Sequence, residues 1–471
     1  MFVHPLRKYP GPTTRAAFQL PNALSILRGT AYKDTRALHD QYGPVVRLAP
    51  NTLSYISSQA WKDIYGFKPD RSELDKHPSY YKRETRNLLG THLVVDKADH
   101  TRMRKLIAPA FSDTALLEQS PLLTQYFDLL VERLKQQIDG PAKGRVNIAA
   151  WFNFTTFDII GDLTLGEPFG ALELGDYTDW MRTVFTSIKL LGVFRFAEAY
   201  TVIGLSFFIL QKLMPSISAK RAAHLAYTKE RIDARIALLT ITPQVLRHNN
   251  GNHGISYQEL LGTCRVFLVA GSETTATLLS GAIFYLLQNP ESMTRLSCEV
   301  REEFPNKDDI TMRSVTVSGK LPYMDAVIKE SFRCYPPVPS TLPRITGSEG
   351  AIIDGRYVPP GISVGVHQWS AYHSSSNFAS PDTFDPDRWL PEAPQKYHGD
   401  DKAVLQPFTI GPRQCIGKGL AYLEIRSVLA RMMWHFEIEL DEESRGWMDD
   451  AREFALWDKP PLWVRLKHRD C

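Results

Sequence analysis

The sequence predicts a mainly α-helical protein with a small β region. Helical periodicity dominates residues 111–255, and a helical pattern of about 33 residues follows from Ser256 to Gln288. Short strand patterns are confined to residues 45–56 and 352–366. At 1.5 Å per residue the long pattern extends roughly 50 Å, which is the width of a large domain.

Length and composition set the first bounds. The 471 residues are 43% hydrophobic, enough for a large core, and the net charge of +3 is too small to argue for nucleic acid. The five cysteines are scattered and odd in number, which favours a reducing compartment over a disulfide framework. We find no signal peptide and no apolar run near the roughly 20 residues that span a bilayer. We therefore expect no transmembrane segment.

The N-terminal part begins with a stiff lead-in, His4–Pro12, because its prolines disfavour helix for themselves and their predecessors. Residues 31–42 are predicted to form a short helix that ends at Gly43-Pro44. Residues 45–48 and 53–56 alternate apolar and polar side chains, as a hairpin does.

A second helix begins near Asp99. It places His100 and Arg104 four residues apart, on one helix face. Two donors on one face can hold a carboxylate, and arginine can do so with two hydrogen bonds. A solvated basic patch is the alternative interpretation.

The middle of the chain is helical in pattern. Residues 151–167 are rich in aromatic and apolar side chains and are predicted to be a core helix. Residues 194–214 have few charges and could roof a pocket, dip into a membrane surface or pack in the core.

The long helix has clear ends. Ser256 and Glu259 form a capping box, and Asn289-Pro290 stops the pattern. Its apolar residues run around most of its circumference, which predicts a helix buried through the core.

Residues 270–275, AGSETT, are poor helix formers within that helix. Such a local conflict often indicates a kink or a functional site. An acid next to an alcohol, here Glu273 and Thr274, can relay protons to a bound ligand. A strained but structural segment is the alternative.

The C-terminal part contains a predicted helix, residues 321–335, in which Glu330 and Arg333 can pair at i,i+3. Strand patterns follow at residues 352–358, with an Asp-Gly turn, and at residues 362–366. His373 has no partner at metal-ligand spacing, and we interpret it as structural.

A single cysteine, Cys415, lies just before a helical pattern at residues 418–436. Backbone N–H groups at that helix start and the charge of Arg413 favour the thiolate. No second cysteine lies nearby, which argues against a zinc knuckle or a CxxC redox pair. A lone thiolate on a loop suits one axial bond to a haem iron; a buried, inert cysteine is the alternative.

The flanking residues have local roles. Gly411 permits a tight turn, and Gly417 lets another flat group approach the backbone closely. Phe408 supplies a ring that can pack beside the sulfur.

These residues match F-x-x-G-x-R-x-C-x-G, and with AGSETT, ExxR and FDPDRW they resemble the cytochrome P450 family over about residues 1–465. The wordings HPLRKYPGP, YGPVVRLAPNTLS and DIIGDLTLGEPFG resemble fungal secondary-metabolism members, of the isotrichodermin C-15 hydroxylase-like branch. The resemblance implies one triangular-prism domain over residues 1–471, with a long central helix over haem b. It also implies that the usual membrane anchor is absent and that residues 240–253 are short for the family.

The resemblance implies a two-sided haem site. Cys415 would be the axial iron ligand, in a loop completed by Phe408, Gly411, Arg413 and Gly417. The propionate ligands implied by the match are His100, Arg104 and Arg344.

On the opposite face of the haem, the resemblance implies a catalytic pair: Thr274 would hold the oxygen intermediate and Glu273 would feed it protons. Small residues at Ala270 and Gly271 would leave room for substrate.

Further roles follow from the resemblance. Glu330 and Arg333 would join Arg388 in a buried scaffold behind the cysteine loop, whereas Arg102 and Lys105 would point outward, towards an acidic redox partner.

The implied function is monooxygenation. The enzyme would activate O2 with electrons from NADPH, passed on by a flavoprotein NADPH-cytochrome reductase. It would hydroxylate or epoxidise a hydrophobic small molecule, a terpenoid or polyketide by analogy, bordered by Phe267, Val338 and Leu342. We expect no nucleic-acid partner, and a cytoplasmic-side location with peripheral contact to the endoplasmic reticulum.

Two alternatives remain open. One is a haem-thiolate enzyme that couples, closes rings or rearranges without net oxygen insertion. The other is a non-catalytic haem sensor or electron carrier, which has no need of a substrate-lining helix with a proton relay.

Overall fold

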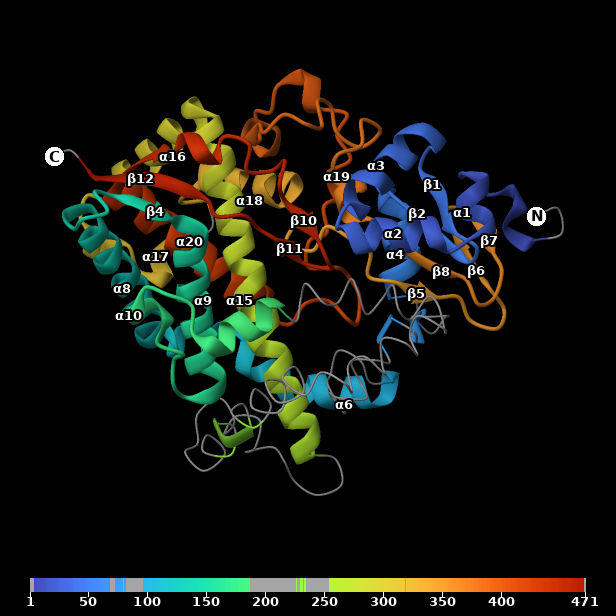
Figure 1. The fold of residues 1–471 in the computed structure, drawn as a ribbon, viewed down its shortest axis with the longest axis horizontal. Helices are drawn as coiled ribbons and strands as arrows, with labels where there is room; N and C mark the ends of the chain where they lie inside the picture. Colours follow the sequence, from blue (N-terminus) through green and yellow to red (C-terminus); the bar gives the residue numbers. More distant parts are fainter. Residues whose placement is uncertain are drawn as a thin grey trace.

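The computed structural model describes residues 4–67, 73–78, 80–81, 96–186, 226, 229–231, 233, 254–317 and 319–469. Helices make up most of this part of the chain, and the strands form small sheets (Figure 1). The mainly α-helical fold class is thereby confirmed. The expectations for residues 194–214 and 240–253 lie outside the described residues, and the single-domain organisation stays a prediction.

The long helix α15 (Tyr257–Gln288) crosses the middle of the molecule (Figure 1). Its start is fixed by the predicted capping box: the Ser256 side chain accepts from the Glu259 N–H, and the Glu259 carboxylate accepts from the Ser256 N–H. It packs extensively against α9 (Ile148–Leu165), which is buried almost throughout. Both helices are therefore core helices, as their apolar patterns predicted.

Other helices surround this pair. They are α6 (Lys97–Ile107), α7 (Asp113–Glu118), α8 (Ser120–Asp139), α10 (Ala171–Leu174), α16 (Pro290–Glu303), α17 (Met312–Thr316), α18 (Pro322–Cys334) and α20 (Lys418–His435). A short 3₁₀ turn, Ala108–Phe111, continues α6. The predicted helices at residues 31–42, 321–335 and 418–436 are confirmed within two residues at each end.

The N-terminal end of the fold is built on a five-stranded sheet of order β1-β2-β8-β5-β3. Its strands are β1 (Val45–Ala49), β2 (Thr52–Tyr55), β3 (Asp75–Lys76), β5 (Arg344–Ile345) and β8 (Ser363–Val366). The predicted hairpin is the antiparallel pair β1–β2, and β8 joins β2 in parallel. Helices α1 (Thr13–Ala17), α2 (Leu20–Arg28), α3 (Ala31–Tyr42), α4 (Ser58–Tyr65) and α19 (Gln368–Tyr372) accompany this sheet.

Smaller sheets complete the β region. The hairpin of β6 (Ala351–Ile353) and β7 (Arg356–Val358) turns at Asp354-Gly355, both with positive φ. At the C-terminus, β4 (Arg145–Asn147), β12 (Trp463–His468) and β9 (Phe436–Leu440) form one sheet, and β10 (Arg452–Glu453) pairs with β11 (Trp457–Asp458).

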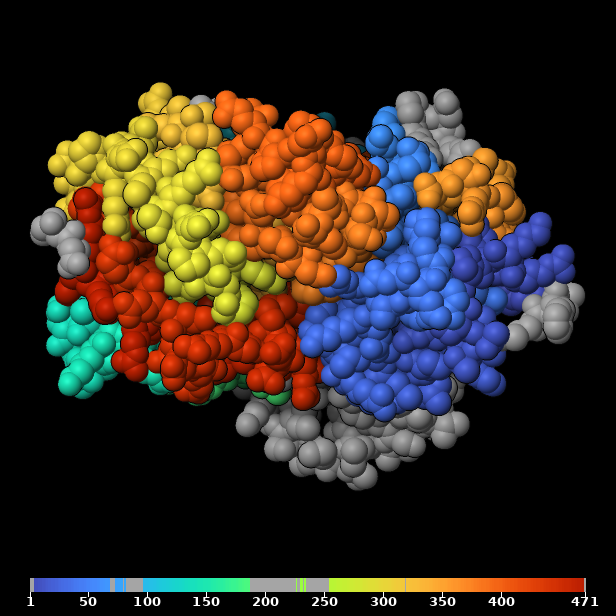
Figure 2. Space-filling model, turned by 90° about the horizontal axis from the view of Figure 1, so that it is seen from above, coloured from blue at the N-terminus to red at the C-terminus, as the bar shows by residue number. Residues whose placement is uncertain are grey.

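The buried apolar residues form two clusters, one in the helical part of the fold and one beside the five-stranded sheet. The larger lies among the helices around α15, and the smaller lies between α4, the five-stranded sheet and α19. Figure 2 shows the same division on the surface, with the N-terminal residues beside the orange segments at one end and the yellow and red segments at the other.

Among the described residues, one helix is long and apolar enough to span a bilayer by length and composition, namely α15. A buried core helix meets the same criteria, so α15 does not contradict the expectation of no transmembrane segment. Of its most apolar window, 67% is buried inside the protein, as in a core helix.

Candidate active site

The cysteine loop is shaped by backbone contacts. Gly411 has φ +79°, and a Cβ there would lie 2.0 Å from the carbonyl oxygen of Tyr65, so no other residue fits. The Cys415 N–H donates to the Phe408 carbonyl at 3.0 Å and closes the loop. The Phe408 ring contacts Phe332 and Tyr422, with ring centroids 5.2 and 5.3 Å away. The predicted tight turn at Gly411 is confirmed.

The charge beside Cys415 differs from the prediction. Arg413 is paired with Glu73, with Nε 2.9 Å from Oε1, and both side chains are buried, so Arg413 is not a free cation. Arg104 is the nearer source of positive charge: its Nη1 donates to the Gln414 carbonyl at 2.6 Å.

Burial raises the pKa of the Cys415 thiol, while the Gly417 N–H, Arg104 and Lys418 act in the opposite direction. The thiolate is thus not favoured by the protein alone, contrary to the prediction. Coordination to a metal deprotonates a thiol by itself.

Basic side chains from distant segments meet next to this loop. We call them the basic cluster: Lys76, His100, Arg104, Arg344 and Arg413. Burial first, and then the charges of the other four, lower the pKa of His100 to about 3, so its imidazole is neutral. The structure thereby brings together the three side chains predicted to bind propionates.

One face of α15 is open although the helix lies in the core. Val266, Ala270 and Thr274 recur every fourth residue, and Ala270 is exposed while the residues from Thr275 to Phe284 are buried. The Thr274 hydroxyl donates to the Ala270 carbonyl at 2.6 Å. The helix continues through this segment without a break, although the sequence indicated a kink or a functional site here.

Glu273 points elsewhere. Its carboxylate forms an ion pair with Lys459, and both side chains are buried. Burial raises the pKa of Glu273, and Lys459 opposes that shift. The structure therefore separates the acid from the open face that carries Thr274.

Gly271 does not serve the predicted purpose. A Cβ at Gly271 would lie 2.8 Å from Cδ1 of Ile160 on α9. The glycine is needed for the close approach of α15 to α9, and not to leave room above a cofactor.

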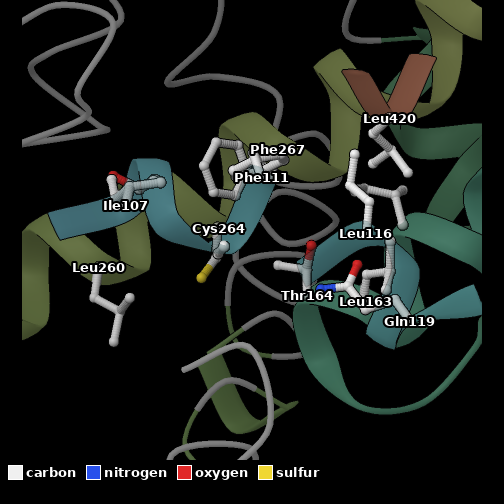
Figure 3. A pocket seen from close by; sticks show the side chains of 13 residues that line it. Ile107, Phe111, Leu116, Gln119, Leu163, Thr164, Leu260, Cys264, Phe267 and Leu420 are labelled. Carbon is white, nitrogen blue, oxygen red and sulfur yellow. The ribbon is translucent and has the colours of Figure 1, made fainter. Parts of the chain in front are cut away.

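Phe267 also lies elsewhere than expected. It packs on Phe111 at a centroid distance of 5.3 Å, in a small apolar cavity that Cys264 also lines (Figure 3). Val338 and Leu342, predicted to border the same substrate, do not line this cavity.

A buried ionic cluster lies behind the cysteine loop. Glu330 accepts from Arg333 at 2.7 and 2.9 Å and from Arg388 at 3.1 Å, and all three side chains are 0% exposed. Arg388 also pairs with Asp400 at 2.6 Å. Because Phe332, next to Arg333, packs on Phe408, the cluster supports the loop as predicted.

The structure also shows the surroundings of Arg102 and His373. Arg102 does not point to an outer partner: it donates to Glu259 at 2.5 Å and to Asp99 at 2.9 Å, and so ties α6 to the start of α15. His373 is buried, stacks on Trp369 and donates from Nδ1 to the Trp369 carbonyl at 3.0 Å, which is a structural position.

Three residues of this region were missed from the sequence. Glu73 pairs with Arg413, Lys459 pairs with Glu273, and Glu424 of α20 hydrogen-bonds Thr275. Each lies at least 149 positions from its partner, and no local pattern distinguishes a lone Glu or Lys that will be buried from one that stays on the surface.

The arrangement fits a haem. Cys415 has accessible surface although protein atoms surround it, and a Cβ on Gly417 would meet only Phe111, at 4.0 Å, so the space beside Gly417 is open. The basic cluster supplies donors for two carboxylates. Thr274 supplies an alcohol on the open face of α15. These features define the class of haem-thiolate proteins that activate oxygen.

Comparison with known proteins identifies the family. A model of the family described as Cytochrome P450 matches residues 10–465. Cytochrome P450 monooxygenase efuB of Hormonema carpetanum is 40% identical over 99% of this chain and 92% of the relative. For cytochrome P450 monooxygenase FUM2 of Gibberella moniliformis the identity is 37%, over 99% and 98%. Averantin hydroxylase of Dothistroma septosporum is 40% identical, over 100% and 88%.

The chain belongs to the cytochrome P450 family. It is an oxygen-incorporating oxidoreductase, and its family uses a haem with a cysteine thiolate as axial ligand. Its relatives are fungal monooxygenases of secondary metabolism, as the sequence motifs predicted.

Proposed function

We propose that Cys415 is the axial ligand of haem b and that the basic cluster holds the two propionates. When bound, the haem supplies the chemistry of O2 activation and oxygen transfer to substrate. The neutral His100 donates a hydrogen bond, whereas Arg104 and Arg344 add charge. The observation that carries this proposal is that His100, Arg104 and Arg344 come together from distant segments, with Arg104 bonded to the Gln414 carbonyl next to Cys415.

On the other side, Thr274 positions a proton at its hydroxyl oxygen, and Glu273 supplies protons to that position. The hydroxyl is already oriented by its bond to the Ala270 carbonyl.

The substrate is a hydrophobic small molecule of secondary metabolism, a terpenoid or polyketide, which the enzyme hydroxylates or epoxidises. The relatives support this class, since one of them is named for hydroxylating averantin. Val338 and Leu342 are half-buried and apolar, as a substrate border requires.

The electron donor is a flavoprotein NADPH-cytochrome reductase. Exposed Lys97, Lys105 and Lys418 surround the segment that carries Cys415 and would attract an acidic partner.

Peripheral contact with the endoplasmic reticulum membrane is supported by exposed apolar side chains at the N-terminal end. These are Phe18 (65% exposed), Ile352 (49%) and Tyr357 (58%). The Tyr9 hydroxyl donates to the Tyr357 carbonyl at 2.9 Å and so joins the N-terminal residues to β7.

The test uses the haem-loaded full chain with reductase and NADPH. Hydrophobic pathway intermediates are first screened for a substrate-induced spin shift, and the responsive compound is then turned over under ¹⁸O₂. We expect a product that gains one labelled oxygen. Oxidised product without label would overturn monooxygenation in favour of coupling or rearrangement.

A further inference from the structure

Lys459 lies in contact with the acid of the AGSETT segment but has no assigned role. Its Nζ contacts Oε1 of Glu273 and lies 2.7 Å from the Thr277 hydroxyl. That hydroxyl is in turn 3.3 Å from the same Oε1. Glu273 and Thr277 are four residues apart on α15, so one ammonium reaches both from one side.

The two carboxyl oxygens of Glu273 are not equivalent. Oε1 has both partners, while Oε2 is buried with no hydrogen-bond partner in the part of the chain that the structure describes. An ionised oxygen left without a partner in the protein interior is costly, so a proton favours Oε2.

Lys459 itself is fixed in place. It follows β11, where Trp457 stacks on Tyr335 at 4.7 Å and donates from Nε1 to the Pro336 carbonyl at 2.8 Å. The Lys459 side chain is 5% exposed and that of Glu273 is 2% exposed. The contact between Lys459 and Glu273 is therefore held between two rigid elements and, being buried, is little affected by salt.

We propose that Lys459 is a positioning residue for oxygen activation: with Thr277 it grips Oε1 of Glu273 and leaves Oε2 to carry the proton. This inference rests on the proposed proton relay through Glu273 and Thr274. In the resting protein Lys459 holds the carboxyl away from the open face of α15, and its charge prepares the carboxyl to give up its proton once it turns towards Thr274.

The charges around Glu273 predict how a change at Lys459 alters the proton affinity of the carboxyl. Lys459 lowers the proton affinity of the carboxyl and Asp458 raises it, and Tyr177 and Tyr335 also face this site. Lys459→Met removes the facing cation, so the carboxyl keeps its proton to higher pH. An opposite charge in direct contact with a carboxyl lowers the pH at which it ionises by about one unit or more.

The experiment titrates the carboxyl directly in the full-length, haem-loaded protein without substrate. The infrared C=O stretch of the protonated carboxyl is followed against pH and is assigned to Glu273 by its absence in Glu273→Gln. We expect the midpoint to rise by about one unit or more in Lys459→Met and to stay in Lys459→Arg. A control, Lys467→Met, removes a surface ion pair with Glu439 and should leave the midpoint unchanged.

A second readout concerns the relay. With reductase and NADPH, the fraction of electrons released as hydrogen peroxide should rise several-fold in Lys459→Met, and Lys459→Met should add nothing in a Glu273→Gln background. An unchanged midpoint in Lys459→Met would reduce Lys459 to a purely structural role and overturn the proposal. If Lys459→Met does not fold, Thr277→Val is measured instead. Loss of the bridging hydroxyl should also raise the titration midpoint of Glu273, and an unchanged midpoint would overturn the proposal.

The peroxide yields of these variants distinguish a failed proton relay from a failed positioning role of Lys459. If Thr274→Ala and Glu273→Gln release no more peroxide than the parent, the proton relay of the proposed function is wrong. If those variants leak peroxide but Lys459→Met and Thr277→Val do not, only the positioning role of Lys459 is wrong.

Discussion

Single side chains in this protein take their chemistry from distant partners. Cys415 gains positive surroundings from Arg104 and Lys418, because Glu73 neutralises Arg413. In the same way Glu273 is defined by Lys459 and not by its neighbour Thr274. The charge state and orientation of such a side chain therefore depend on its partners in the fold as well as on its residue type.

Thr274→Ala tests the alcohol on the open face of α15. Loss of the hydroxyl should leave haem binding intact, lower product formation at least about tenfold and divert electrons to hydrogen peroxide. Peroxide and product per NADPH are measured together. Thr274→Ser keeps the hydroxyl and should couple like the parent; equal coupling in the alanine variant would count against the role of Thr274.

Glu424 offers a residue-level test through pH. Burial raises its pKa to about 8, and the Thr275 bond only partly opposes this. Because the unfolded carboxyl ionises near 4.5, stability is lost as pH rises from about 4.5 to 8. Glu424→Gln removes that loss, so the variant should exceed the parent by a few kcal/mol at pH 8 and by little at pH 5.

The measurement is urea unfolding at both pH values. Glu442→Gln is the control, because its side chain is 88% exposed. A difference between Glu424→Gln and parent that is the same at pH 5 and pH 8 would refute the buried, neutral state of Glu424.

At the scale of elements, the contact of α15 with α9 depends on one glycine. Gly271→Ala would place a methyl 2.8 Å from Cδ1 of Ile160 and should destabilise the fold by about 1–3 kcal/mol. Ile160→Val removes that atom, so the double variant should recover part of the loss. The free energy of unfolding is measured for the four proteins; simple additivity of the two single changes would contradict direct contact.

The elements themselves were largely predictable. The capping box of α15, the Asp354-Gly355 turn and the apolar pattern of α9 are local signals, and each produced the predicted element. The cysteine loop could be located because its motif is compact, and the resemblance pointed to His100, Arg104 and Arg344, which the structure brings together. Local patterns cannot show the packing role of Gly271 or the pairing of Arg102 with Glu259, since both depend on how distant segments meet.

At the scale of the whole molecule, burial of histidines sets the response to acid. Among the described residues, burial lowers the pKa of six histidines: to about 4 in His39, to about 3 in His100, His367, His373 and His435, and by less in His77. Unfolded histidine takes up a proton near 6.5, whereas these do not, so stability falls as pH drops from about 6.5 towards 3.

We therefore expect the free energy of unfolding in urea to fall steeply between pH 7 and pH 5, by about 2 kcal/mol for each of the five histidines with a pKa of about 3 or 4. His367→Asn should reduce this dependence, because Asn can still accept the bond from the Ser370 N–H. His468→Asn, at a half-exposed side chain, should not. An acid dependence that is equal in the two variants would contradict this origin.

All of the proposed chemistry depends on Cys415 as the axial ligand of the haem. The most direct measurement is the carbon monoxide difference spectrum of the reduced protein, for the parent, Cys415→Ser and Cys298→Ser. Cys298 is an exposed cysteine on α16 and serves as the matched control. The account predicts the haem-thiolate band in the parent and in Cys298→Ser and its loss in Cys415→Ser. A haem-thiolate band that persists in Cys415→Ser would contradict it.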